Sequence, residues 1–268
     1  MAELSKNTPT EHPGGLLRTW RQRRRLTQLE LSCESGISTR HLSFLETGRA
    51  MPSRSMLLKL CEELDLALRE RNRLFLASGF APIYPETPLE HPSLSLARSA
   101  METVLTGLEP NPALVIDRHW TLISSNRAVP PLLKGVACWL LEPPLNVLRV
   151  SLHPEGLAPR IVNFRDWREH LLARLRRQAN LSADPVLVEL MQEVVKYPQA
   201  KQDQSEPTNS NSAVVPFSLA VENGVLRFMS TTMLFGLPLD ITLSEMAVEC
   251  FFPADLETKE NLRKGFDT

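Results

Sequence analysis

Apolar residues between positions 14 and 80 recur every three or four places, which is the spacing of amphipathic helices. We expect five short helices, separated by turns and capped by polar residues. None of them can bury its apolar side alone, so the pattern predicts an all-α bundle in which the helices cover one another. The predicted helices span residues 16–25, 27–35, 38–46, 53–64 and 67–78.

The pattern changes after residue 80. Prolines at positions 82, 85, 88 and 92 predict an extended, semi-rigid linker over residues 81–94. Predicted helices then come before segments in which apolar and polar residues alternate with a period of two. This order favours an α+β domain with an antiparallel sheet and helices packed on one side of it. We expect helices at 93–107, 126–133, 166–178, 184–196 and 254–264, and strands at 113–116, 121–124, 213–222, 225–235 and 241–251.

Short polar signals refine this picture. Asn223 and Gly224 separate two alternating runs and predict a two-residue hairpin turn. Residues 201–212 are polar and are expected to be mobile, and residues 1–13 are expected to form a disordered N-terminus.

The best-defined local signals lie between Thr27 and Gly48. Thr27 and Glu30 form a capping box, in which a hydroxyl and a carboxylate satisfy backbone N–H groups at the start of a helix. Gly36 supplies the left-handed conformation that ends this helix, and Ser38 can cap the next one. Two short helices joined by a tight glycine turn are the unit that proteins use to place one helix in the major groove of DNA.

The second helix of this unit has two different sides. Leu42 and Leu45 share one side, whereas the opposite side carries hydroxyl groups, a guanidinium group and an aromatic ring. A guanidinium can bind the O6 and N7 atoms of guanine, and a ring can contact the methyl group of thymine. The residues on this outward side are Thr39, Arg40, Ser43 and Phe44.

The segments LRTWRQRRRLTQLEL, ISTRHLSFLETGRAMPS and LLKLCEELDLAL closely resemble the phage-repressor-like (XRE/Cro-type) helix-turn-helix domain. The resemblance covers residues 14–78 and implies a DNA-binding domain over residues 14–80. It also implies that Arg21 and Glu46 form a structural ion pair. Together with the outward side, it gives the candidate DNA-binding residues Gln28, Ser38, Thr39, Arg40, Ser43 and Phe44.

The second part of the chain resembles the ligand-binding domain of MmyB-like regulators, which has a PAS-like fold. The segments that carry the resemblance are PALVIDRHWTLISSNRAVPPLL, PLNVLRVSLHPEGLAPRIVNFRDW and TTMLFGLPLDITLSEMAVECFFPAD. It implies a domain for ligand binding and dimerisation over residues 95–268. The implied ligand is a small molecule, with fatty-acyl-like compounds as the expected class.

A ligand pocket in such a domain would lie between the sheet and the helices, and inward strand residues would line it. Core packing is the alternative interpretation for each candidate. Asn126 differs from the others because a polar side chain just after an apolar strand can orient the head group of a ligand. Arginines at positions 165, 168, 174, 176 and 177 could hold a carboxylate or form a solvated helix face. The pocket candidates are Val115, Trp120, Leu122, Asn126, Trp139, Phe228, Met233 and Phe235.

Charge is divided unevenly along the chain. Residues 11–80 contain twelve Lys and Arg against eight Asp and Glu, a net +4, whereas residues 81–268 carry a net −5. A basic first part beside an acidic second part concentrates phosphate attraction in the first part.

The four cysteines have no paired spacing, and the six histidines occur singly. This favours a reducing, cytoplasmic location and argues against a disulfide framework or a metal site. No apolar run is long enough for a membrane span.

These observations favour a sequence-specific transcription regulator that binds operator DNA as a homodimer and responds to a small apolar or fatty-acyl-like ligand. The alternative is a regulator whose second domain is a ligand-free dimerisation or protein-interaction module. An enzyme is not expected, because the chain has no nucleophile elbow, zinc-protease, phosphate-loop or dinucleotide-binding motif, and no cofactor is implied.

Overall fold

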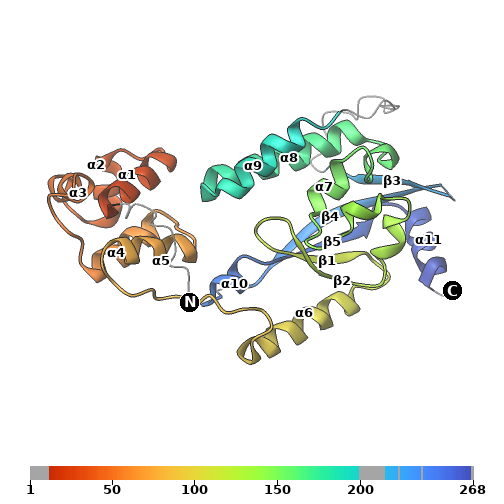
Figure 1. Cartoon of the computed structure of the whole chain (residues 1–268), viewed down its shortest axis with the longest axis horizontal. Coiled ribbons are helices and arrows are strands. Elements are labelled where there is room, and N and C mark those ends of the chain that lie inside the picture. The colour runs from red at the N-terminus through yellow and green to blue at the C-terminus, as the bar shows by residue number, and fades with distance from the viewer. Residues whose placement is uncertain (1–11, 199–214, 223, 237, 267–268) are drawn as a thin grey trace, which may run out of the picture. The chain divides into compact units, whose positions relative to one another are not determined.

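The computed structural model describes residues 12–198, 215–222, 224–236 and 238–266. They form two compact units (Figure 1). The first unit ends at Thr87 and also takes in Pro238–Ile241, and the second unit contains the rest of the chain. The segment expected to be mobile, 201–212, and most of the expected disordered N-terminus lie outside the described residues.

Five helices build the first unit, as the apolar spacing predicts. They are α1 (Pro13–Arg23), α2 (Gln28–Ser35), α3 (Thr39–Glu46), α4 (Arg54–Glu63) and α5 (Leu68–Ala77). Helix α1 begins at Pro13 rather than at residue 16. The reason is that the His12 ring accepts a hydrogen bond from Gly14 N at 3.1 Å, and proline suits the first turn of a helix.

The core of this unit is formed almost entirely by leucine. Leu17 from α1, Leu42 from α3 and Leu57 from α4 are fully buried, and Phe75 of α5 is buried with them. Helices α1 and α3 approach closely at Gly14, where an added Cβ atom would lie only 2.1 Å from the Leu45 carbonyl oxygen. The absence of a side chain at this position is therefore what permits the observed packing of α1 on α3.

Residues after α5 stay attached to the first unit. The buried Asn72 side chain accepts from Ile83 N at 2.9 Å and donates to the Tyr84 carbonyl oxygen at 2.6 Å. Ile241 N donates to the Pro85 carbonyl oxygen at 2.8 Å. Farther on, a short 3-10 helix, η1 (Pro92–Leu94), lies in the predicted linker.

The second unit is built around one antiparallel five-stranded sheet. The strands are β1 (Ala113–Ile116), β2 (Leu122–Ser125), β3 (Phe217–Val221), β4 (Gly224–Leu234) and β5 (Ala247–Pro253), in the order β2-β1-β5-β4-β3. Strands β3 and β4 pair as the two alternating runs predict, with Val221 opposite Gly224, whereas Asn223 lies outside the described residues. The predicted fold class, an all-α helix-turn-helix region followed by an α+β region with an antiparallel sheet, is confirmed.

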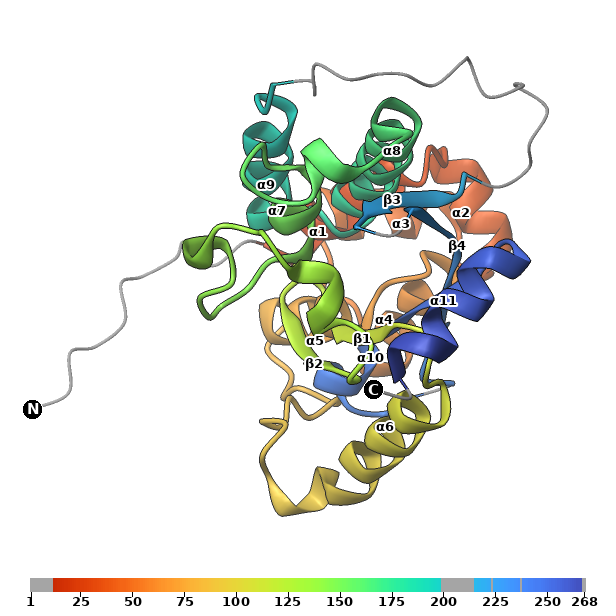
Figure 2. The ribbon, with the colours of Figure 1, turned by 90° about the vertical axis from the view of Figure 1, so that its right-hand side faces the viewer.

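Helices cover both faces of the sheet, which corrects the prediction of one covered face (Figures 1 and 2). Helix α6 (Ser95–Gly107) packs Met101 and Leu105 against Val115 and Val248 on one face. The opposite face meets a larger apolar cluster that includes residues of α7 (Val147–Leu152), α8 (Phe164–Ser182) and α9 (Pro185–Val195). The last helix, α11 (Leu256–Phe266), lies near β4 and β5.

Some predicted elements have other boundaries or another form. The strand expected at 241–251 is β5, and it begins only at Ala247, because Ile241–Ser244 forms a helical turn, α10, whose first residue is buried and bonded to Pro85. The helix expected at 126–133 is reduced to a 3-10 turn, η2 (Pro130–Leu133), since two prolines remove backbone donors. Further 3-10 turns are η3 (Cys138–Leu140) and η4 (Ala158–Arg160). Helix α7 is not predicted.

Candidate functional sites

Helix α3 is held so that one side points away from the core. Ser38 caps its start, with its hydroxyl oxygen accepting from His41 N at 3.3 Å, and Gly36 ends α2 with a φ of +63°. Leu42 and Leu45 are buried against the rest of the unit. The opposite side is therefore turned outward, as the helical spacing predicts.

The outward side of α3 is cationic and partly ordered by its own contacts. Arg40 is exposed, and its guanidinium lies 5.5 Å from the centre of the Phe44 ring; that of Arg49 lies 6.0 Å from the same ring. The Thr39 hydroxyl donates to the Ser32 hydroxyl of α2 at 3.1 Å. Ser43 and Phe44 are half-buried. Two guanidinium groups beside one ring offer a surface that suits stacked bases and phosphates.

One carboxylate joins three helices of this unit. Glu46 of α3 accepts from Arg21 of α1 through both oxygens, at 2.6 and 2.8 Å, and from the Gln28 amide of α2 at 2.8 Å. Burial alone would raise the pKa of Glu46, but the hydrogen bonds from Arg21 and Gln28 outweigh it and hold this pKa below its ordinary value. Gln28, a candidate DNA contact, thus has its amide nitrogen engaged inside the domain.

The arginine run at the end of α1 also makes contacts within the unit. Arg24 donates to the Leu64 carbonyl oxygen at 2.7 Å and to that of Asp65 at 2.6 Å. The guanidinium groups of Arg23 and Arg24 lie 5.5 and 5.8 Å from the Trp20 ring. Arg24 therefore stabilises the end of α4, where carbonyl oxygens lack helical partners.

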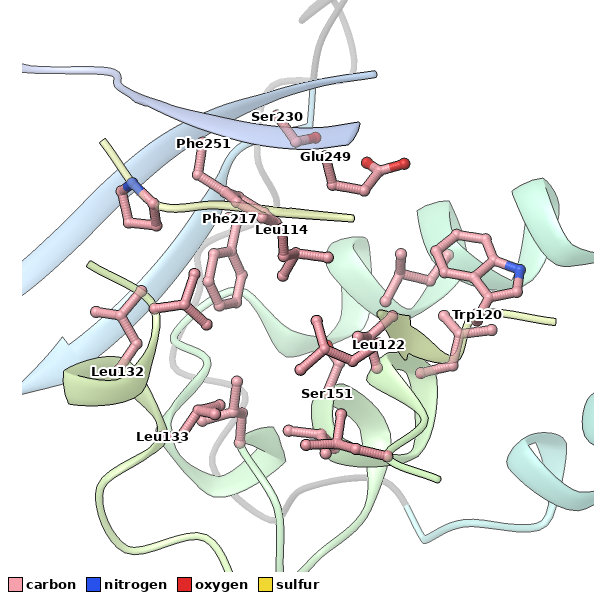
Figure 3. Close-up of a pocket in the computed structure, with 18 of the residues that line it drawn as sticks. Leu114, Trp120, Leu122, Leu132, Leu133, Ser151, Phe217, Ser230, Glu249 and Phe251 are labelled. Carbon is pink, nitrogen blue, oxygen red and sulfur yellow. The ribbon is translucent and has the colours of Figure 1, made fainter. Parts of the chain in front are cut away.

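The second unit contains a cavity of about 110 Å³ between the sheet and the helical layer of α7 and α8 (Figure 3). Its wall is dominated by leucine, valine and aromatic side chains from β1, β2, β3, β5, α7, α8 and the connections between them. The lining residues are Pro112, Leu114, Trp120, Leu122, Val129, Leu132, Leu133, Leu145, Val147, Leu148, Val150, Ser151, Leu157, Trp167, Leu171, Arg174, Phe217, Ser230, Glu249 and Phe251.

A charged pair interrupts the apolar wall. Arg174 of α8 forms two hydrogen bonds with Glu249 of β5, one of them 3.0 Å from Nη1 to Oε2. The Thr232 hydroxyl donates to the same carboxylate at 3.1 Å. The Arg174 guanidinium also lies 4.5 Å from the centre of the Trp120 ring.

Trp120 is held in an uncommon backbone conformation. Its φ of +67° lies in the left-handed region, which bulky residues rarely adopt. Its indole nitrogen donates to the Gln178 Oε1 atom at 2.8 Å, and the Gln178 amide in turn donates to the Arg118 carbonyl oxygen at 2.7 Å. These contacts with α8 fix the ring at the wall of the cavity.

The structure brings together only some of the pocket candidates. Trp120 and Leu122 line the cavity, and the others do not. Asn126 is buried, but its side chain bonds to backbone atoms of Ala113, Leu105 and Asn111, which makes it a structural residue.

The other candidates do not line the cavity. Trp139 is 52% exposed and bonds to Glu155, and Phe228 is fully buried beside the cavity wall. Val115, Met233 and Phe235 do not line the cavity either, because Val115 and Phe235 pack in the cluster on the α6 side of the sheet, and Met233 is 39% exposed.

The polar residues of the cavity were not identified by sequence reasoning. Arg174 was one of five arginines considered, and only its neighbour Glu249 distinguishes it. Glu249 lies two residues before Phe251 in β5, so both share the face that lines the cavity. A carboxylate two residues away from an inward phenylalanine in a predicted strand is the signal that could have identified Glu249.

A helix-turn-helix unit with a cationic outward helix, joined to a second unit that contains an apolar cavity, defines the class of DNA-binding transcription regulators with an added domain. The chain belongs to the MmyB-like transcription regulators, because the family model described as MmyB-like transcription regulator ligand binding domain matches residues 97–264, more than half of the chain. A helix-turn-helix family model matches residues 17–71. Both resemblances stated from the sequence are confirmed, and these families are of the regulator type rather than enzymes.

The similarity to a solved structure is weak. The PAS domain from Bordetella pertussis BvgS is similar over 65% of this chain and 96% of its own, with 14% identity and a TM-score of 0.25, and a similarity this weak supports no argument. None of the curated proteins matches the chain. No helix in the described part of the chain combines the length and apolar character needed to cross a membrane.

Proposed function

We propose that this regulator binds a specific operator as a homodimer through α3, and that a small apolar, fatty-acyl-like ligand in the cavity controls this binding. The observation that carries the proposal is the apolar cavity in the second unit of a chain whose first unit is a helix-turn-helix domain.

The DNA-reading role is supported by the chemistry of the outward side of α3. The Arg40 guanidinium is exposed and suits the O6 and N7 acceptors of guanine. Phe44 beside it suits a thymine methyl group, and Ser43 suits a base edge or a phosphate. Ser38 and the start of α2 at Gln28 lie at helix N-termini, which favour phosphate oxygens. Two copies related by a two-fold axis would place both α3 helices in successive major grooves about 34 Å apart.

The ligand role is supported by the composition of the cavity wall. Leucine and aromatic side chains surround the cavity, and polar groups occur at only a few positions of its wall. Sites for apolar small molecules usually have this composition. A ligand alters DNA binding only if it has different affinities for the state of the protein that binds DNA and the state that does not. DNA must then alter the affinity for the ligand by the same factor.

A second candidate function is a dimerisation or protein-interaction module without ligand. Apolar side chains on β4 favour it, because Met229, Met233 and Leu234 are exposed, the last of them by 72%. β4 pairs with β3 only up to Phe228, so this stretch has no strand on its outer edge among the described residues.

The proposal is tested by measuring DNA and ligand affinity in one system. A duplex selected from random oligonucleotides is labelled, and its affinity is measured by fluorescence anisotropy with and without decanoate and methyl decanoate. We expect a preference for the selected duplex and a change in affinity when a binding acyl compound is added. Equal DNA affinity with and without every acyl compound that binds would remove the sensor role and favour the ligand-free module. Equal affinity for all duplexes would remove the operator-reading role.

A further inference from the structure

We infer that the ligand of the cavity has an uncharged head group, such as an ester, alcohol or aldehyde, and is not a free carboxylic acid in its ionised form. This inference rests on the proposed function, since it specifies the chemical class of the ligand that the cavity takes.

The charges in the wall of the cavity are balanced. Of the described residues that line the cavity, Arg174 and Glu249 are the charged ones, and they have opposite signs. They are bound to each other by two hydrogen bonds between the guanidinium and the carboxylate. The wall therefore carries no net charge with which to attract an anionic head group.

Both terminal nitrogens of the Arg174 guanidinium donate to Glu249, and the face of the guanidinium lies on the Trp120 ring. Glu249 is held in place independently, because the Thr232 hydroxyl donates to it and its side chain is only 6% exposed. A ligand carboxylate that took over these two nitrogens would have to displace Glu249, which would leave a buried carboxylate without its cation and next to a second negative charge.

His170, which lies beside the wall, does not supply a replacement cation. His170 is stacked on Trp167, a residue of the wall, with ring centres 5.5 Å apart. Burial and the nearby Arg174 charge lower the pKa of His170, so its ring is neutral near neutral pH.

The remaining polar groups suit a neutral head. The Ser151 hydroxyl lines the cavity and accepts from the Trp167 indole nitrogen at 3.0 Å. A hydroxyl that accepts one bond still has its own hydrogen to donate, for example to an ester or aldehyde oxygen. Ser230 places a second hydroxyl at the wall, on the side of Glu249 (Figure 3).

The test compares three probes with chains of ten carbons: methyl decanoate, 1-decanol and decanoate. Trp120 and Trp167 lie in the wall, so binding to the full-length protein can be followed by tryptophan fluorescence and checked by calorimetry at pH 7.5. We expect both neutral compounds to bind at least about tenfold more tightly than decanoate.

Glu249→Gln provides the decisive variant, because it keeps the shape of the side chain and leaves the Arg174 charge uncompensated. We expect this variant to gain affinity for decanoate by about tenfold or more relative to methyl decanoate. Glu193→Gln is the matched control, since Glu193 pairs with Arg149 and does not line the cavity. Its preference among the three probes should equal that of the unchanged protein.

Each outcome decides a different point. Tighter binding of decanoate by the unchanged protein overturns the inference and leaves the proposed ligand function standing. An unchanged preference in Glu249→Gln also overturns it, because the ion pair would then not select the head group. If none of the three probes binds, the proposed ligand function fails, and the inference fails with it. The comparison on the unchanged protein decides the inference even if the variant does not fold.

Discussion

At the scale of single residues, Glu46 is the most consequential side chain of the first unit. It accepts hydrogen bonds from Arg21 and Gln28, and thereby joins α1 and α2 to α3. The Glu46 side chain is 2% exposed and that of Arg21 is 10% exposed, so water replaces little of the interaction if one partner is lost. The orientation of α3 relative to α1 therefore depends on a buried charge pair.

Glu46→Gln should destabilise the first unit by about 3 kcal/mol, because it leaves the Arg21 guanidinium buried without its counter-charge. Urea unfolding followed by circular dichroism measures this change. The matched control is Glu86→Gln, which removes the carboxylate paired with Arg69 at a far more exposed position and should cost much less. Equal losses in the two variants would show that burial of the pair has no special effect.

The same carboxylate gives a pH dependence with a defined sign. Since the pKa of Glu46 is lower in the folded protein than its ordinary value of 4.5, its contribution to stability is complete above that value. The contribution is lost as the pH falls through the lowered folded pKa. Unfolding measured from pH 7 down to pH 3 should show this acid-side loss in the unchanged protein and a smaller one in Glu46→Gln. Parallel curves would contradict this assignment.

Arg40→Ala should reduce operator affinity by about 1–3 kcal/mol and relax the sequence preference at one base pair. The reason is the exposed guanidinium on the outward side of α3. Anisotropy titrations with the selected duplex and with duplexes altered at each position measure both effects. Arg40→Lys separates the contributions, because lysine keeps the charge and lacks the two-pronged geometry. An equal loss on every duplex would make Arg40 a phosphate contact.

At the scale of elements, two adjacent glycines of α1 differ in their distance from α3. A Cβ atom on Gly14 would lie 2.1 Å from the Leu45 carbonyl oxygen and 2.8 Å from that of Glu46. A Cβ atom on Gly15 would meet nothing within 4 Å. Only the first glycine is therefore required by the contact between the two helices.

Gly14→Ala should destabilise the first unit, because backbone atoms of α3 cannot move aside without disturbing the helix. Gly15→Ala should instead stabilise it by about 0.5–1 kcal/mol, as expected for alanine in place of glycine in a helix. Thermal unfolding of both variants measures the difference. Two variants with the same sign of change would show that α1 does not approach α3 as closely as described.

The boundaries of an element can be predicted from the sequence where neighbouring residues set them. They are harder to predict where residues far away along the chain set them. The capping box at Thr27 and Glu30 is formed as the sequence predicts. Helix α7 was missed, although Asn146 caps it through bonds from Leu148 N and Arg149 N, because its apolar run is too short to show a period. The late start of β5 depends on Ile241, whose backbone bonds to Pro85 far away along the chain.

At the scale of the whole molecule, charge and connectivity distinguish the two parts. The net charge is +4 over residues 11–80 and −5 over residues 81–268. The chain passes between the two units three times, after Thr87, before Pro238 and after Ile241. Pro238–Ile241, four residues beyond the end of β4, thus belongs to the first unit, and β4 carries Ser230 of the cavity wall.

The concentration of positive charge predicts a steep salt dependence of DNA binding. Raising the salt from about 50 to about 200 mM should weaken operator binding tenfold or more, because counterions released from phosphates drive the association. Anisotropy titrations over a series of salt concentrations give the slope. A nearly flat response would indicate that few phosphates are contacted and would contradict the proposed mode of docking.

The sequence by itself determined the helix-turn-helix unit, the antiparallel hairpin and the two families, because caps, turns and apolar periods act over a few residues. Only the tertiary structure decided the content of the cavity. It paired Arg174 with Glu249, which are 75 residues apart. It also directed the Asn126 side chain to backbone atoms, so that Asn126 does not line the cavity. A local pattern states which side of an element is inward, but long-range packing selects which inward side chains meet.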